Sequence, residues 1–257
     1  MVHEHADKTR IAEWRETLDV LSAEEILAWA ADAFPGQISL ASSLGVEDQV
    51  LTQMIAAQRL PIGIFSLDTG RLFPEAHDLI AETTRRYSVA IRVYVPAAED
   101  VETMVSAHGV NLFRDGVAER KRCCEVRKLR PLRRALSGSR AWVCGLRREQ
   151  SVTRAEVEAI EWDEANGLVK INPLHAWTEA DVWAYVREHD VVYNPLHDRG
   201  FPSVGCAPCT RAIEPGEDVR AGRWWWESAE HRECGLHAHR EGSRSADEPS
   251  SAEGGER

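Results

Sequence analysis

The stretch QISLASSLGVED, residues 37–48, passes from an apolar run through a turn of small residues to a polar segment. Its first half, 37–42, predicts a buried strand, and its second half leads into a helix expected near 47–58. Strands that alternate with helices of this length indicate an α/β fold, here a single domain with a mainly parallel sheet and helices on both of its faces. Three more strands are expected downstream, at 62–68, 90–96 and 141–146.

Apolar spacing and capping residues predict further helices around these strands. The first of them carries a capping box, Ser22 with Glu25, and the last begins with Thr178 and Asp181. Proline at position 74 suits the first turn of a helix. The expected helices lie at 22–34, from about Pro74, at 118–136 and at 178–190.

Composition limits the classes to which the protein can belong. It has 257 residues, of which 43% are hydrophobic, enough for one α/β domain with a real core. The formal net charge of -11 argues against nucleic acid or an anionic membrane as the main partner. No apolar run approaches the roughly 18 residues that span a bilayer, and the charged N-terminus lacks an apolar signal-peptide core. We therefore expect a cytoplasmic protein.

Three parts are expected along the chain: an α/β domain at 1–215, a C-terminal segment at 216–239 and a disordered tail at 240–257. The tail is rich in Ser, Glu, Gly and Arg and almost without apolar residues. Within the domain, 120–134 gathers eight basic residues around one acid, Glu125. An acidic protein that concentrates cations in this way is expected to hold an anion there, although a solvated helix face has a similar composition.

Three loops follow predicted strands, where parallel α/β sheets bind their ligands. The first, 42–48, brings small residues and a glycine to a helix start, so that backbone N–H groups can approach an anion. The second, 67–75, carries an Asp, a Thr and an Arg, and the third, 145–154, carries three arginines that could clamp an anion. Each loop alone could be an ordinary polar turn, but three at strand ends predict a binding site.

Six cysteines stand at positions 123, 124, 144, 206, 209 and 234. A cytoplasmic location disfavours structural disulfides and leaves metal binding or catalysis. The close pairs Cys123–Cys124 and Cys206–Cys209 match either a closed tetrahedral metal site or an iron–sulfur cluster. Adjacent cysteines suit the separated iron corners of a 4Fe–4S cluster better than one small zinc ion, so the spacing favours the cluster over zinc and over unpaired core cysteines.

The cysteine pairs also bear on the roles of Lys128 and of the two remaining cysteines. Lys128 lies one helical turn after Cys124 and can stand between a cluster and a bound anion. Cys144 lies in the apolar stretch AWVCG and is interpreted as a small buried hydrophobe. Cys234 lies in ECGLH, residues 233–237, beside the polar tail, where neither a core nor a partner is evident. That setting leaves two interpretations open, an incidental cysteine of a tail or a mobile nucleophile.

Several of these motifs occur together in one known family. The chain resembles the assimilatory adenylyl-sulfate (APS) reductases, the iron–sulfur branch of the APS/PAPS reductase family. The resemblance extends from about residue 40 to residue 237. The stretches that carry it are SSLGVED, LDTGRLFPE, KRCCEVRKLRPL, GLRREQS, INPL, GCAPCTR, GRWWWE and ECGLH.

The resemblance implies an adenine-nucleotide α-hydrolase-like fold and assigns roles to matching residues. Cys234 would be the catalytic nucleophile, with Lys128 and His237 acting beside it. Cys144 departs from the family pattern, which has a small polar residue such as Thr there. The implied ligands of a 4Fe–4S cluster are Cys123, Cys124, Cys206 and Cys209. The implied substrate-binding residues are Ser42, Ser43, Gly45, Asp48, Leu67, Asp68, Thr69, Gly70, Arg147, Arg148, Arg154 and Arg220.

The implied activity is the thioredoxin-dependent reduction of APS to sulfite and AMP in assimilatory sulfate reduction. The Cys234 thiolate would attack the sulfur of APS, displace AMP and become S-sulfonated, and a dithiol protein such as thioredoxin would then release sulfite. A mobile segment lets one cysteine serve both a closed pocket and an external protein. RWWWE, residues 223–227, would anchor that segment by packing its indoles on the body.

Three alternatives stay open. PAPS, or both nucleotides, could be the substrate, although reductases specific for PAPS typically lack the two cysteine pairs. An ATP-pyrophosphatase-type tRNA sulfur-transfer enzyme usually has two glycines before the Asp of its phosphate loop and a Ser after it; here Gly45 stands alone and Gln49 follows Asp48. A non-catalytic iron–sulfur sensor would leave ECGLH without a purpose.

Overall fold

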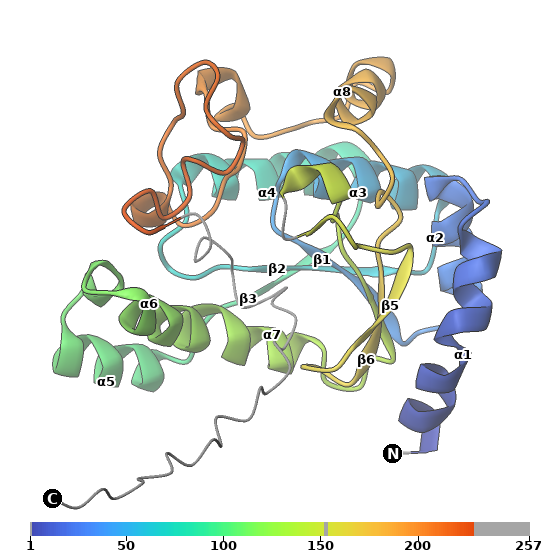
Figure 1. The fold of residues 1–257 in the computed structure, drawn as a ribbon, viewed down its shortest axis with the longest axis horizontal. Helices are drawn as coiled ribbons and strands as arrows, with labels where there is room; N and C mark the ends of the chain where they lie inside the picture. Colours follow the sequence, from blue (N-terminus) through green and yellow to red (C-terminus); the bar gives the residue numbers. More distant parts are fainter. Residues whose placement is uncertain (1, 152–153, 229–257) are drawn as a thin grey trace, which may run out of the picture.

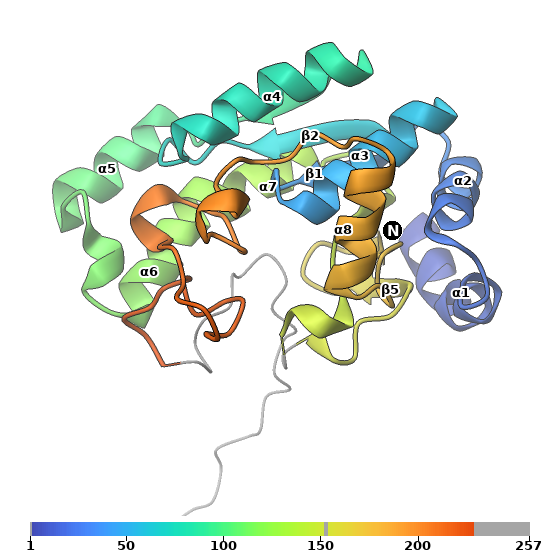
Figure 2. The same cartoon turned by 90° about the horizontal axis from the view of Figure 1, so that it is seen from above.

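The computed structural model describes residues 2–151 and 154–228, which form an α/β fold with helices on both faces of one sheet (Figures 1 and 2). The strands of this sheet are β1 (Ile38–Ser42), β2 (Gly63–Leu67), β3 (Ile91–Tyr94), β4 (Ala141–Val143), β5 (Ile160–Asp163) and β6 (Leu168–Ile171). The helices are α1 (Val2–Leu18), α2 (Ala23–Ala33), α3 (Val46–Gln58), α4 (Pro74–Tyr87), α5 (Ala98–His108), α6 (Val117–Cys124), α7 (Arg130–Ala135) and α8 (Glu179–Glu188).

The strand order is β3-β2-β1-β4-β6-β5, and every neighbouring pair is parallel except β5 with β6. From β1 the chain moves outward through β2 to β3, then returns to β4 on the other side of β1. The chain therefore continues from β1 and from β4 toward opposite edges of the sheet. This divergence creates the crevice in which sheets of this kind bind their ligands.

Successive strand residues point to opposite faces of the sheet, so the core has two parts. Leu40 and Val143 belong to the larger part, which is formed with apolar residues of α1, α2, α3 and α8. Phe65 and Trp142 lie on the opposite face, where Leu132 of α7 packs against them. Figure 1 shows the two helical layers that result.

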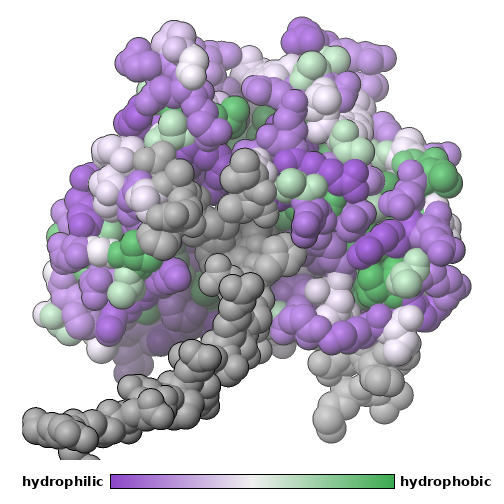
Figure 3. Space-filling view, viewed as in Figure 1, coloured by the Kyte–Doolittle hydropathy of each residue, from purple (hydrophilic) through white to green (hydrophobic). Residues whose placement is uncertain are grey.

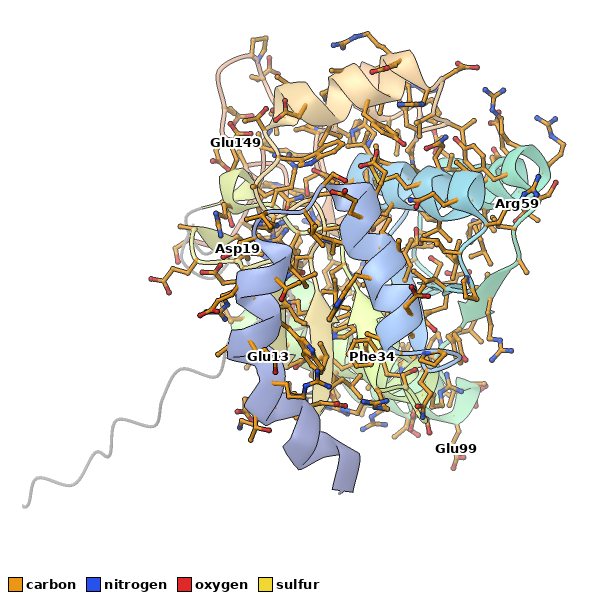
Figure 4. All side chains as sticks on the ribbon, turned by 90° about the vertical axis from the view of Figure 1, so that its right-hand side faces the viewer. Glu13, Asp19, Phe34, Arg59, Glu99 and Glu149 are labelled. Carbon is orange, nitrogen blue, oxygen red and sulfur yellow. The ribbon has the colours of Figure 1, made fainter. Side chains whose placement is uncertain are left out.

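Helices α1 and α2 lie next to each other at one side of the sheet (Figure 4). Phe34, the residue that ends α2, receives edge-on contacts from Trp14 and Trp29, with ring centroids 5.6 and 6.1 Å away. Helix α1 is not among the helices expected from the sequence, because its own apolar pattern is weak and its helical state depends on this packing.

The expected fold class is confirmed. The four expected strands correspond to β1–β4, a helix does begin at Pro74, and the capping boxes at Ser22 and Thr178 are both formed. The hairpin of β5 and β6, with four residues in each strand, was not among the expected elements. Asp163 supports its turn by accepting hydrogen bonds from the backbone of Ala165 and Asn166.

The basic helix expected at 118–136 is present, but it has a wide turn in its middle. Residues Glu125–Leu129 form a π turn directly after the vicinal cysteines, and the backbone of Arg130 donates to Glu125. Pro131 explains the change, since it has no N–H and its ring clashes with the carbonyl four residues earlier. Turns of this kind occur often at functional sites.

The surface of the described residues is mainly polar on the face shown in Figure 3, where apolar residues form small separate groups. Among the described residues, none of the helices combines the length and apolar character required to cross a bilayer.

Candidate active site

A cavity of about 570 Å³ opens at the carboxyl ends of β1, β2 and β4. It contains most of the side chains that the sequence predicts for substrate binding. Asp68, Gly70 and Arg148 are not among the residues that line it. The predicted residues that do line it are Ser42, Ser43, Gly45, Asp48, Leu67, Thr69, Lys128, Arg147, Arg154 and Arg220.

The loop after β1 is closed by a carboxylate from the first turn of α3. Asp48 accepts hydrogen bonds from the backbone N–H and the hydroxyl of Ser43, both at 2.6 Å, and the Leu44 N–H donates to Ser42. From the sequence, N–H groups of this loop were expected to approach an anion. Those of Ser43 and Leu44 instead donate to side chains of the protein. Burial raises the pKa of Asp48 to about 6, and the bonds from Ser43 oppose that shift.

This raised pKa predicts a pH dependence of stability. The unfolded carboxyl titrates near 3.8, so the folded state binds the extra proton between that pH and about 6. The free energy of unfolding should therefore fall as pH rises through this window, by about 1.4 kcal/mol per unit. Urea unfolding from pH 4 to 7 should show this fall in the wild type and a flatter profile in Asp48→Asn. Equal pH profiles for the wild type and Asp48→Asn would show that the pH dependence does not come from Asp48.

Gly145, after β4, lies directly against the start of α3. A Cβ atom on it would stand 2.5 Å from Asp48 Oδ1 and 2.9 Å from the Glu47 Cβ. Only glycine allows the loops after β1 and β4 to approach this closely.

Gly145→Ala should consequently destabilise the protein by about 1–3 kcal/mol, as overpacking does, and weaken nucleotide binding. Gly45→Ala is the matched control, because Gly45 has a φ of -71° and its nearest new contact would be 3.4 Å away. Urea unfolding and titration with AMP measure both effects. A Gly145 variant as stable as the Gly45 variant would contradict the close approach.

The arginines of the loop after β4 have separate partners. Arg147 is 4% exposed and binds Glu47 through Nε at 3.0 Å and Nη2 at 2.9 Å. Arg148 turns away from the cavity and donates to the carbonyl of Val157 and to Glu158. Arg154 lines the cavity and donates to Gln150. The three arginines therefore do not form one clamp.

The loop after β2 connects the cavity to the cysteines. Thr69 Oγ1 lies 3.2 Å from Cys206 Sγ, and the carbonyl of Thr69 accepts a 2.7 Å bond from the buried Arg127. Asp68 accepts from the backbone of Gly70 and lies 2.9 Å from His77 Nε2. Gly70 has a φ of +69°, which this turn requires. Asp68 and Gly70 thus shape the loop, while Thr69 faces both sites.

The four paired cysteines line a second, smaller cavity together with basic and aromatic side chains. Burial raises the pKa of the Cys123 thiol, and it raises that of Cys209 to about 11, with the neighbouring Cys206 adding to the effect. The free thiols of Cys123 and Cys209 would thus stay protonated at neutral pH. Among the described residues, no three His, Cys, Asp or Glu side chains are grouped to hold a single metal ion.

The donor set nevertheless fits a cluster with several iron corners better than a single ion. Four cysteines line one cavity, and a cubane would require four such sulfur atoms. Two buried donors next to them, Trp224 Nε1 and Arg223 Nε, have no acceptor among the described residues, and thiolate or sulfide atoms would provide one. Cys144 is separate: it is buried in the sheet, and burial raises the pKa of its thiol far above the usual value.

Four residues line both cavities and so form their common wall: Lys128, Cys206, Arg223 and Trp224. The sequence placed Lys128 there but missed Arg223, which is 6% exposed. Its guanidinium fills the space over Gly205, where a Cβ atom would lie within 2.3 Å of it, and donates to the carbonyl of Val204. The basic residue inside GRWWWE was the available signal, but its contact with Gly205 is long-range.

Trp224 is held between two guanidinium groups, those of Arg120 and Arg223, each 4.7 Å from its ring. Arg120 Nε also donates to both oxygens of Glu227, at 2.7 and 3.0 Å, and these two side chains are 1% and 4% exposed. The backbone of Trp224 donates to Cys209. Trp224 and Trp226 of RWWWE thus pack on the body of the protein, and an ion pair takes part; the segment that RWWWE is expected to anchor is not among the described residues. Cys234 and His237 lie outside the described residues.

The chain is similar to several known proteins. Residues 37–212 match the family described as the phosphoadenosine phosphosulfate reductase domain. A protein of Allochromatium vinosum named adenosine 5'-phosphosulfate reductase is 60% identical over 200 residues, with 78% of each chain covered. One with the same name from Burkholderia cepacia is 56% identical over 201 residues, which cover 78% of this chain and 80% of that protein.

The solved structures agree with these sequence relatives. A phosphoadenylyl-sulfate reductase from Candida auris, crystallised as a phosphate complex, has a TM-score of 0.69 at 30% identity and covers 80% of this chain and 97% of its own. An FMN adenylyltransferase from Candida glabrata, at 19% identity and a TM-score of 0.51, covers 79% of this chain and 70% of its own and shares the fold. The chain belongs to the phosphoadenosine phosphosulfate reductase family.

Proposed function

We propose that this protein reduces adenosine 5'-phosphosulfate to sulfite and AMP, with a dithiol protein such as thioredoxin as the electron donor. The relatives at 60% and 56% identity carry the name of this activity. The observation that carries the proposal is the common wall of the two cavities, where Lys128 and Arg223 face a nucleotide-sized space on one side and four cysteines on the other.

The substrate would lie with its nucleoside over the loop Leu67–Gly70 and its phosphosulfate against the cations of the common wall. Lys128 and Arg223 belong to that wall, and Arg154 and Arg220 also line the large cavity. Fixed cations of this kind stabilise the charge that develops on the departing phosphate oxygen of AMP.

The chemistry is two nucleophilic displacements at sulfur. The Cys234 thiolate attacks the sulfur of APS, a new S–S bond forms, and the bond from that sulfur to the phosphate oxygen breaks and releases AMP. A thiolate of the donor then attacks the Cys234 sulfur, and sulfite leaves with the electron pair of the S–S bond. The donor's second thiol resolves the mixed disulfide, so the donor is oxidised to a disulfide and Cys234 is restored.

We assign Cys234, with His237 beside it, to a C-terminal segment at 216–239 that continues from the 1–215 domain and precedes the tail at 240–257. The anchor at Trp224 and Glu227 lies close before this nucleophile in the sequence. Cys234 follows Glu227 by seven positions, and an extended chain of that length spans up to about 25 Å. A segment fixed at the common wall can thus carry a thiol between the cavity and solvent.

We assign Cys123, Cys124, Cys206 and Cys209 as the ligands of a 4Fe–4S cluster. When bound, such a cluster supplies a fixed charge distribution next to the cations of the common wall. Lys128 contributes to both sides: it orients the anionic substrate, and its ammonium lowers the cost of a thiolate at the neighbouring Cys123, because it favours the charged form there.

Lys128→Ala should therefore slow sulfite release by about 100-fold, the loss typical for removal of one group that stabilises developing charge. The visible absorption of the cluster should stay. Lys121→Ala on the same helix is the matched control, because Lys121 is exposed and lines neither cavity. Single-turnover kinetics with APS measure the effect. Equal rates for the two variants would remove Lys128 from the chemistry.

A second candidate substrate, PAPS, is favoured by the similarity to the Candida auris enzyme. Release of sulfite from APS and from PAPS, with thioredoxin and anaerobically purified protein, separates the two. We expect a preference for APS. Incubation with APS alone should also add about 80 Da to Cys234, the mass of a transferred sulfonate group. Preferred turnover of PAPS, or an adduct on Cys144 instead, would overturn the proposal.

A further inference from the structure

The first turn of α3 carries two carboxylates, those of Glu47 and Asp48, that accept hydrogen bonds from other side chains of the protein. Glu47 Oε1 accepts three hydrogen bonds, from Arg147 Nε at 3.0 Å, Arg147 Nη2 at 2.9 Å and Gln150 Nε2 at 2.9 Å. Beside it, Asp48 Oδ2 accepts two bonds from Ser43. Both carboxylates line the large cavity. Glu47 thus joins the start of α3 to the loop after β4.

A glycine turn that leads from a strand into a helix N-terminus is ordinarily an anion site, because its N–H groups and the helix dipole favour negative charge. A buried cation strengthens this preference, and Arg147 is 4% exposed. Here the groups that would receive a phosphate are engaged by Glu47 and Asp48. Gly145 leaves no spare room, since even a methyl group on it would meet both acids.

We propose that Glu47 is a specificity-determining residue whose carboxylate fills the anion site at the start of α3 from inside the protein. Nucleotides with a polyphosphate chain are thereby rejected at this position. The shorter phosphosulfate of the substrate is directed instead to the cations of the common wall. The inference rests on the proposed function only in taking the natural ligand to be a nucleotide.

Two physical effects support the rejection. A polyphosphate at the start of α3 would face two carboxylates at short range, and repulsion between unit charges a few ångströms apart is large in a partly buried site. The polyphosphate would also have to displace Glu47 from Arg147, which would leave two buried charges to be paired again. Without Glu47, in contrast, Arg147 is a buried cation that requires an anion.

Direct binding tests the inference without any turnover. Inorganic tripolyphosphate, ATP and AMP are titrated calorimetrically into the anaerobically purified full-length protein. Glu47→Ala removes both the charge and the volume of the side chain and should bind tripolyphosphate and ATP at least about ten-fold more tightly than the wild type. Affinity for AMP, which has no polyphosphate, should change less than about three-fold.

Matched variants separate the specific site from general electrostatics. Glu179→Ala makes the same truncation at another carboxylate that lines the cavity, and its gain for tripolyphosphate should stay below about three-fold. In the double variant Glu47→Ala/Arg147→Met, the increase in affinity for tripolyphosphate should be abolished. If Glu47→Ala also loses AMP binding, Glu47→Gln, which keeps the shape of the side chain, is used instead. We expect Glu47→Gln to increase the affinity for tripolyphosphate by a smaller factor.

The inference is overturned if Glu179→Ala and Glu47→Ala increase the affinity for tripolyphosphate equally. It is also overturned if neither Glu47 variant increases that affinity while AMP affinity is preserved. A third contradicting result is an increased affinity for tripolyphosphate that persists in the double variant Glu47→Ala/Arg147→Met. A protein that binds polyphosphate as predicted but fails to release sulfite from APS would contradict the proposed function alone, because none of these titrations depends on turnover.

Discussion

Replacing Cys234 by serine is expected to reduce sulfite release from APS by at least about 1,000-fold, because a hydroxyl at this position is not ionised at neutral pH and forms no S-sulfonated intermediate. AMP should still bind, since the cations of the cavity are untouched. The visible absorption of the cluster should also persist, because the four proposed ligands lie elsewhere in the chain.

Cys144→Ser is the matched control, with the same exchange of thiol for hydroxyl at a cysteine that is 2% exposed. The Cys144 thiol is held protonated by its burial, so this variant should retain sulfite release within a few-fold of the wild type. Sulfite assays with thioredoxin, together with absorption spectra of both variants, measure the difference. Turnover that survives in Cys234→Ser, or is lost only in Cys144→Ser, would refute the proposed nucleophile.

Arg120→Met should give the largest loss of stability. The ion pair of Arg120 with Glu227 is almost fully buried, and removal of one partner leaves an uncompensated charge, at a cost of about 3–5 kcal/mol. For a domain of this size that corresponds to a fall in Tm of roughly 10 °C. Loss of the guanidinium also frees one face of Trp224, so cluster content and sulfite release should fall with stability.

Arg199→Met provides the comparison. Arg199 pairs with Glu75 at 2.8 Å, but its side chain is 60% exposed, so its removal should cost less than about 1 kcal/mol. The double variant Arg120→Met/Glu227→Met should recover most of the stability, because replacing both partners by apolar groups leaves no buried charge. Thermal unfolding followed by circular dichroism measures all three. Similar losses for Arg120→Met and Arg199→Met would show that the buried pair is not the anchor.

The parts of the site that depend on local spacing were predictable. Cys123, Cys124, Cys206 and Cys209 were recognised as one set from the distances within each pair, and they do line one cavity. Lys128 was placed between two sites by a single helical turn, and it lines both cavities. Spacing of this kind is preserved on folding because it is a property of the backbone over a few residues.

The partners of the charged side chains were not predictable. Arg148 and Arg147 are adjacent in the sequence and equally basic, yet Arg147 binds Glu47 in the cavity and Arg148 binds Glu158 outside it. The position of Arg223 inside GRWWWE marked it in the sequence, but nothing local indicated that it fills the space above Gly205. These outcomes depend on residues far apart in the chain, which only the packing of loops around the sheet brings together.

By itself, the sequence determined the α/β class, the strand-to-helix units and the residue types available for cation and thiol chemistry, because hydrophobic period, capping and short-range spacing are local properties. Tertiary structure alone decided that two cavities share a wall, that Trp224 lies between Arg120 and Arg223, and that Glu47 and Asp48 occupy the start of α3. The physical reason is that a buried charge must find its partner wherever the fold places one, and sequence distance does not limit that choice.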